Sequence, residues 1–198
     1  MKLLAALSIC FLSFLVTVEG NPEPCESPKL LEGQMTTLNM SKGTAVYAKF
    51  AYDAIQKRIY ALKTTLFEGD EQGQVVDIKL YQESVQYTFY LANRTCVKHP
   101  LHVPFKPIRV PDNAKFLSQM YIGSSASPRE GLLANVWTEE CDSGFCVLTF
   151  TEYGCLPLSF LYRSNKDSTL NLESFMSLTY GISDPNVFRP PVECFHPN

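Results

Sequence analysis

The strongest constraint on the fold is an alternation of apolar and polar residues with a period of two. It is clearest where Val85, Tyr87, Phe89 and Leu91 are separated by Gln86, Thr88 and Tyr90. A β-strand with one buried face has this pattern, because successive side chains point to opposite sides of a sheet. The pattern recurs at 46–52 and 170–182, and further strand candidates lie at 55–67, 74–81, 115–122, 131–138, 146–153 and 156–163.

Turn signals between these segments predict that neighbouring strands pair in antiparallel order. About nine strands without alternating helices favour a mostly β fold, either a sandwich or a curved sheet, over an α/β fold. Four prolines between His99 and Pro111 predict an extended crossover between two sheets, because proline cannot complete a ladder of hydrogen bonds. Asp184 and Pro185 predict a short helical turn at 184–188, with Asp184 as its N-cap.

The N-terminus has the three parts of a secretory signal peptide. Lys2 supplies a positive charge, an apolar run follows from Leu3 to Val16, and Val18-Glu19-Gly20 offers small residues for cleavage. The apolar run is shorter than the ~20 residues that a membrane-spanning helix needs. We therefore expect a signal peptide at 1–20, a single domain at 21–198, an extracellular location and no transmembrane segment.

Six cysteines remain once Cys10 is removed with the signal peptide. An even number in an exported chain predicts disulfides, and the paired spacing typical of zinc sites is missing. Fifteen pairings of six cysteines are conceivable. Local geometry suggests one of them, because Cys141 and Cys146 flank a short Asp-Ser-Gly turn between two strand-like segments.

Two glycosylation sequons agree with export, at Asn39 and Asn93. The net charge is −3 and the sequence pI is about 5.6, without a run of Lys or Arg. Nucleic acid is therefore not an expected partner, because its recognition needs a basic surface.

No catalytic motif is recognisable, so the sequence favours a protein that is not an enzyme. His99 and His102 straddle a proline and are interpreted as loop residues and not as metal ligands. Two acidic groups offer oxygen ligands for loosely bound calcium, although solvated turns are the preferred interpretation. No metal ligand is assigned, and no cofactor is expected other than this calcium; the groups are Glu68, Asp70 and Glu71, and Glu139, Glu140 and Asp142.

The chain is rich in aromatic residues, with 13 Phe, 10 Tyr and one Trp. A β core favours such residues in any case. A curved sheet whose inner face lines an apolar ligand cavity would use them too. Composition does not separate these two interpretations.

The spacing of cysteines and nearby motifs resembles the ependymin family. The resemblance covers roughly residues 24–195. It depends on Pro24-Cys25, a sequon next to Cys96, Gly154-Cys155-Leu156-Pro157, Tyr121-Ile-Gly123, Val136-Trp137, and an ending that runs from Gly181 through Asp-Pro-Asn-Val-Phe-Arg-Pro-Pro to Cys194.

This resemblance implies more than the residues themselves do. Ependymin-related proteins are similar to bacterial lipoprotein carriers, with two stacked, curved antiparallel sheets, a half-open form and a hydrophobic pocket. The family is secreted or lysosomal, tends to form homodimers, and is linked to anionic lipids, calcium and cell–matrix contact. It implies the pairs Cys25–Cys155 and Cys96–Cys194, which leaves Cys141–Cys146. The chain lacks the acidic C-terminal tail of fish brain ependymins, so calcium binding through such a tail and a neural role are not expected.

The leading hypothesis is a secreted glycoprotein, not an enzyme, that binds an apolar small molecule or lipid between its sheets. The alternative is a structural glycoprotein of the extracellular matrix, in calcified tissue for example, whose partners are calcium, matrix components or cell surfaces. In the first case nine side chains would line the pocket: Val85, Tyr87, Phe89, Leu91, Leu158, Phe160, Met176, Leu178 and Tyr180.

Overall fold

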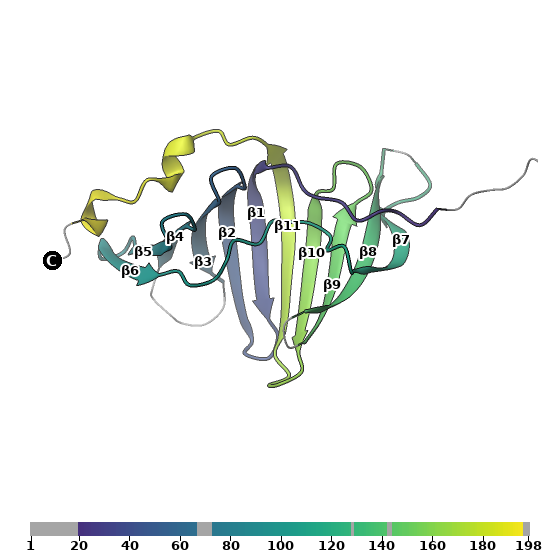
Figure 1. The fold of residues 1–198 in the computed structure, drawn as a ribbon, viewed down its shortest axis with the longest axis horizontal. Coiled ribbons are helices and arrows are strands. Elements are labelled where there is room, and N and C mark those ends of the chain that lie inside the picture. The colour runs from purple at the N-terminus through teal and green to yellow at the C-terminus, as the bar shows by residue number, and fades with distance from the viewer. Residues whose placement is uncertain (1–19, 67–72, 128, 142–143, 196–198) are drawn as a thin grey trace, which may run out of the picture.

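The computed structural model describes residues 20–66, 73–127, 129–141 and 144–195 (Figure 1). Its strands are β1 (Leu30–Asn39), β2 (Thr44–Asp53), β3 (Arg58–Thr65), β4 (Gln74–Leu80), β5 (Val85–Tyr90), β6 (Thr95–Pro100), β7 (Lys115–Gly123), β8 (Gly131–Cys141), β9 (Gly144–Thr151), β10 (Pro157–Ser164) and β11 (Leu170–Tyr180). Two short 3-10 helices follow, η1 (Pro185–Phe188) and η2 (Val192–Cys194).

The strands form one curved antiparallel sheet that does not close into a barrel. Within the described residues it has 11 strands in the order β6-β5-β4-β3-β2-β1-β11-β10-β9-β8-β7. The chain runs outward from β1 to β6 at one edge, crosses to β7 at the other edge, and returns to β11 beside β1 (Figure 1). The mostly β, antiparallel, half-open architecture is confirmed. The two expected layers, however, are two meanders joined into one sheet, because β1 pairs with β11 along most of its length.

Two extended segments cross one face of this sheet, which we call the covered face. The crossover, residues 101–114, connects the two edge strands. Residues 20–29 run alongside this crossover (Figure 1). The two segments are hydrogen-bonded to each other, through Ser27 N to Ile108 O at 3.0 Å and Val110 N to Cys25 O at 2.8 Å. The expected proline-rich crossover is therefore confirmed, but it links the two edges of a single sheet.

The C-terminal segment covers the opposite face of the sheet near β3 to β6. The Arg58 guanidinium lies 4.2 Å from the centre of the Phe188 ring in η1, and η2 contacts β6. The helical turn predicted at 184–188 is confirmed as η1, whose N-cap Asp184 accepts a hydrogen bond from Asn186 N at 2.9 Å. The sheet at β3 to β5 is thus covered on both faces, whereas most residues of β6 are exposed.

Candidate functional site

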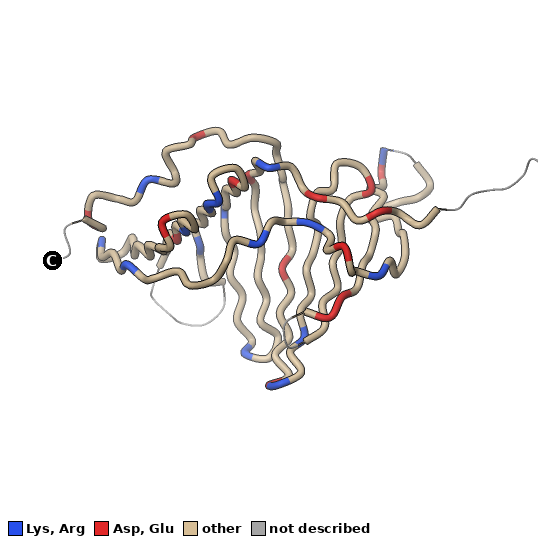
Figure 2. The backbone as a smooth tube through the Cα atoms, viewed as in Figure 1, with Lys and Arg blue, Asp and Glu red and all other residues tan. Residues whose placement is uncertain are grey.

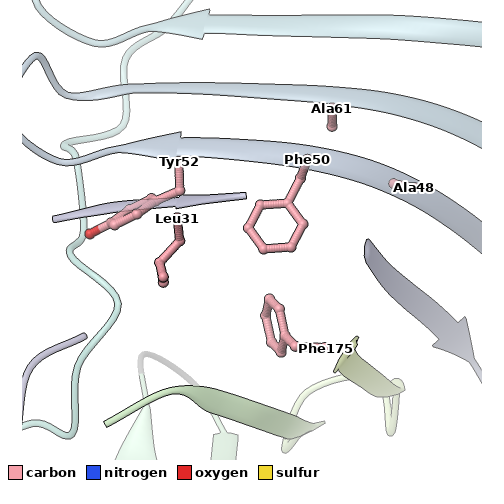
Figure 3. Close-up of a cluster of buried hydrophobic side chains, with 6 residues drawn as sticks. All are labelled: Leu31, Ala48, Phe50, Tyr52, Ala61 and Phe175. Carbon is pink, nitrogen blue, oxygen red and sulfur yellow. The ribbon is translucent and has the colours of Figure 1, made fainter. Parts of the chain in front are cut away.

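A central cluster of buried side chains lies on the covered face. Figure 3 shows the rings of Phe50 from β2 and Phe175 from β11 pointing toward one another. The centres of these two rings are 5.8 Å apart. Tyr52 is 1% exposed, and its hydroxyl accepts a hydrogen bond from Ile108 N in the crossover at 3.1 Å. The crossover is therefore attached to the sheet above this cluster.

A cavity of about 430 Å³ adjoins the cluster, between the sheet and the crossover. Apolar side chains form most of its wall, and the small ones among them, Val46 and Ala61, come from β2 and β3. This volume falls within the range of small-molecule sites. The wall is formed by Met35, Thr37, Val46, Phe50, Tyr52, Ile59, Ala61, Lys63, Asp77, Lys79, Ile108, Phe160, Glu173 and Phe175.

Two of the charged side chains in the wall form a direct pair. Lys63 Nζ donates to Asp77 Oδ2 at 2.6 Å, and the Thr88 hydroxyl donates to Asp77 Oδ1 at 2.8 Å. Burial by itself would raise the pKa of Asp77. The hydrogen bond and charge of Lys63, with the Thr88 hydrogen bond, outweigh burial and hold this pKa below its ordinary value.

The other two charged side chains, Lys79 and Glu173, are shifted toward their neutral forms. Burial lowers the pKa of Lys79, and repulsion by Lys63 adds to the shift. Burial raises the pKa of Glu173, against the attraction of Lys79 and Lys63. The cavity therefore combines an apolar wall, one satisfied ion pair and two charges of opposite sign that are only partly compensated.

Only one of the nine side chains proposed to line the pocket, Phe160, is among the described residues of the cavity wall. Val85 and Tyr87 pack with Ile78 and Cys194 on the opposite face, and Phe89 is buried on that face too, because odd-numbered residues of β5 point away from the cavity. Sequence reasoning took the apolar face of β5 as the cavity face. Both faces are covered here, so apolarity does not reveal which one borders the hollow.

The remaining proposed positions lie at the margins of the cavity or outside it. Leu178 packs against the central cluster, and Leu158 is half-buried in β10. The other three, Leu91, Met176 and Tyr180, are 38%, 40% and 66% exposed.

A β-bulge explains why β11 faces the cavity with residues that alternation did not select. Glu32 pairs with Thr179 but Gln34 pairs with Met176, so β11 carries an additional residue opposite Gly33. Ser177 has a positive φ of 51° at this point. As a result, the odd-numbered Glu173 and Phe175 point into the cavity, whereas the pocket residues predicted on this strand were the even-numbered Met176, Leu178 and Tyr180. A non-glycine residue with positive φ leaves no clear mark in a sequence.

The three predicted disulfides are present. Cα–Cα distances are 6.0 Å for Cys25–Cys155, 5.0 Å for Cys96–Cys194 and 6.0 Å for Cys141–Cys146. The first joins the N-terminal segment to the β9–β10 turn, and the second joins β6 to η2. Both long-range bridges therefore attach a covering segment to the sheet.

The sequons lie at strand ends. Asn93 is exposed in the β5–β6 turn, where its side-chain oxygen accepts from Thr95 N at 3.2 Å. Asn39 ends β1, and its side-chain oxygen accepts from Lys42 N at 2.8 Å.

The acidic groups considered for calcium are only partly described. Glu68, Asp70, Glu71 and Asp142 lie outside the described residues. Glu139 and Glu140 line a separate hollow of about 350 Å³ together with Lys115. Among the residues that the structure does describe, no three His, Cys, Asp or Glu side chains gather closely enough to hold a metal ion.

A family model described as Ependymin matches residues 70–194, which is more than half of the chain. The chain belongs to the ependymin family. It is 28% identical to mammalian ependymin-related protein 1 of Rattus norvegicus over 185 residues, covering 88% of this chain and 78% of that protein. It is 26% identical to ependymin-2 of Carassius auratus over 195 residues, covering 98% and 89%. The family assignment made from the cysteine spacing is thus confirmed.

Solved structures support the fold alone. An uncharacterized conserved protein from Thermus thermophilus has a TM-score of 0.56 at 10% identity, with 87% of this chain and 88% of that chain covered. The MucB structure has a TM-score of 0.52 at 12% identity, covering 85% and 60%. Within the described part of the ependymin-family chain, no helix has the length and apolar character required to cross a membrane.

Proposed function

We propose that this ependymin-family protein is a secreted binder of an apolar small molecule or lipid, and that it performs no catalysis. The observation that carries the proposal is the cavity of about 430 Å³ between the sheet and the crossover. Its apolar wall would stabilise an acyl chain by about 25 cal/mol for each Å² removed from water, before the costs of association. The charged residues of the wall would orient the polar end of the ligand.

Export accounts for the covalent features of the chain. Cleavage of a signal peptide after Gly20 would leave residues 21–198 as one domain with three disulfides. We propose glycosylation at Asn93, which is exposed in a turn, and at Asn39, which ends a strand.

We further propose that the protein forms a homodimer through the outer edge of β7. Exposed apolar side chains gather here, including Leu117, Tyr121 and Ile122, which are 61%, 54% and 46% exposed. Antiparallel pairing of β7 with a second copy about Gln119 would place Leu117 opposite Tyr121. The only charged residue of the strand, Lys115, would then face Gly123, so no like charges would meet.

Calcium has a secondary place in this proposal. One of its two sequence candidates, the group around Asp70, lies outside the described residues. A shift in melting temperature with added calcium, abolished by Asp70→Asn and Glu71→Gln together, would establish a site there.

Solvent extraction of the secreted protein tests the ligand proposal. The full-length gene is expressed in a secretory host, and the purified protein is extracted with organic solvent for mass spectrometry. We expect stoichiometric lipid from the wild type and much less from Ala61→Phe, which fills the cavity. Ala92→Phe makes the same change at an exposed turn position and should retain the lipid.

Two further measurements make this test decisive. Thermal melting shows whether Ala61→Phe folds, and Ala61→Leu replaces it if it does not. A clean wild-type extract, with no uptake of a fluorescent fatty acid, would contradict ligand binding and favour the structural role in the extracellular matrix.

A further inference from the structure

The four charged side chains of the cavity wall are unequally satisfied. The Lys63–Asp77 pair is closed by direct hydrogen bonds, with Thr88 as an additional donor. Lys79 and Glu173 instead interact with the other charges only through space, and neither forms a hydrogen bond or close ion pair with another described residue. One cationic group and one anionic group therefore remain available to a ligand.

These two groups approach the cavity from different sides. Lys79 belongs to β4 and Glu173 to β11, with β3, β2 and β1 between them in the sheet. Charged residues are sparse along the strands in the middle of the sheet (Figure 2). The charged residue of β11 is Glu173, and that of the neighbouring β1 is Glu32. A ligand in the hollow would be bordered by a positive group on one side and a negative group on the other.

The sign of these charges discriminates between classes of polar head. A neutral head can form hydrogen bonds with Lys79 and Glu173 but compensates the charge of neither. An anionic head satisfies Lys79 but repels an ionised Glu173, and a cationic head has the opposite defect. Because unpaired charge in an apolar wall is unfavourable, a head that carries both signs fits the wall best.

We propose that the cavity accepts a single-chain amphiphile with a zwitterionic head, whose anion binds Lys79 and whose cation binds Glu173. This inference depends on the proposed ligand-binding function and specifies the chemical class of the ligand. The acyl chain lies along the apolar wall beside Phe50 and Phe175, and Lys63 and Asp77 stay paired with each other.

The test compares four probes with the same chain length, below their micellar concentrations, on delipidated full-length protein at pH 7. They are a lysophosphatidylcholine, a lysophosphatidylglycerol, a monoacylglycerol and an alkyl trimethylammonium salt. Calorimetry should show the zwitterionic probe binding about tenfold more tightly than each of the others, as expected of one additional contact between opposite charges at the low-dielectric wall.

Single substitutions assign the two contacts. Lys79→Met and Glu173→Gln should each lower the affinity of the protein for the zwitterionic probe by about tenfold, while its affinity for the monoacylglycerol stays the same. The matched controls are Lys49→Met, on the opposite face of β2, and Glu83→Gln, in an exposed turn, and neither should change binding.

The possible failures are distinguishable. Equal affinity for all four probes would overturn the zwitterionic head and leave the apolar cavity in place. Tightest binding of the anionic probe would also overturn it, since Glu173 would then be protonated in the complex. Failure of every probe to bind would overturn the proposed ligand-binding function itself.

Discussion

The two halves of the sheet bury their covered faces in different ways. On the β2–β4 side, small or charged residues such as Ala61, Lys63 and Asp77 face the crossover and leave a hollow. On the β7–β10 side, Trp137, Phe150 and neighbouring rings fill the corresponding space between sheet and crossover. The ring centres of Phe116 and Trp137 are 5.5 Å apart. The backbone architecture is continuous across both halves. Side-chain volume therefore decides where this fold leaves a hollow.

The two edges of the sheet differ as well. At β6, a disulfide to η2 covers the strand, and Lys98 and Pro100 discourage further pairing. At β7, exposed apolar side chains lie along a strand that pairs only with β8 among the described residues. The roles of the two edges in assembly can therefore be compared by placing a charge on each.

The largest expected effect is loss of a long-range disulfide. Replacing Cys25 and Cys155, or Cys96 and Cys194, by alanine should each lower the free energy of unfolding by about 4–5 kcal/mol, because loops of 130 and 98 residues are released. Loss of Cys141–Cys146, five residues apart, should cost only about 2 kcal/mol. Denaturant unfolding measures these differences.

Hydrogen exchange then shows which half each disulfide protects. Loss of Cys25–Cys155 should accelerate amide exchange mainly in β8 and β9, whose core includes Cys155. Loss of Cys96–Cys194 should do so mainly in β5 and β6. Uniform acceleration in both variants would contradict separate roles for the two bridges.

Enlarging or truncating core side chains should affect the two halves differently. Trp137→Ala in the packed half should cost about 3–5 kcal/mol, because Trp137 is 2% exposed and tightly surrounded. Ala61→Leu in the hollow half should cost less than about 1.5 kcal/mol, because the additional atoms enter existing space. Unfolding in urea provides both values, and a larger cost for Ala61→Leu would disprove the contrast.

Charge placed on the two edges should separate their roles in assembly. Ile122→Lys on β7 should convert the proposed dimer to a monomer, with little change in folding stability. Val97→Lys on β6 is a matched control, since Val97 is 40% exposed and Ile122 is 46% exposed. Sedimentation analysis reports the mass, and a dimer that persists in Ile122→Lys would place the interface elsewhere.

The smallest expected effect is the pH dependence caused by the hollow half. The pKa of Glu173 is raised in the folded state, so its contribution to stability is present below its unfolded value of about 4.5 and declines as pH rises through the folded pKa. Glu173→Gln should therefore gain stability relative to the wild type over that range.

Asp77 should show the opposite sign. Its pKa is lowered, so its contribution is present above about 3.8 and is lost as pH falls through the folded pKa. Asp77→Asn should thus be less stable than the wild type at neutral pH and approach it in acid. Stability curves from about pH 2 to about pH 8, which extend below and above the ordinary carboxylate pKa values of about 4, test both signs. Parallel curves for the two variants would contradict the assignment.

Much of the fold could be predicted from local pattern. Period-two alternation identified β2, β5 and β11, and six further apolar segments bounded by turn signals correspond to β3, β4 and β7 to β10. It missed β1, where Gly33 and neighbouring polar residues weaken the pattern, and β6, which ends at Pro100. The cavity wall was mostly not predicted, for two reasons. The bulge at Ser177 changes which residues of β11 face the cavity, and the C-terminal segment buries Tyr87 on the opposite face of the sheet.

The sequence by itself determined the mostly β, antiparallel fold class, the short hairpin disulfide and the helical turn at Asp184. Each of these depends on residues close together in the chain. The cysteine and proline motifs also sufficed for the family. Only the tertiary structure decided that β1 joins β11, that both faces of β3–β5 are covered, and that Lys79 and Glu173 border one hollow. These features arise from contacts between distant segments, whose free energies depend on how the whole sheet curves and is covered.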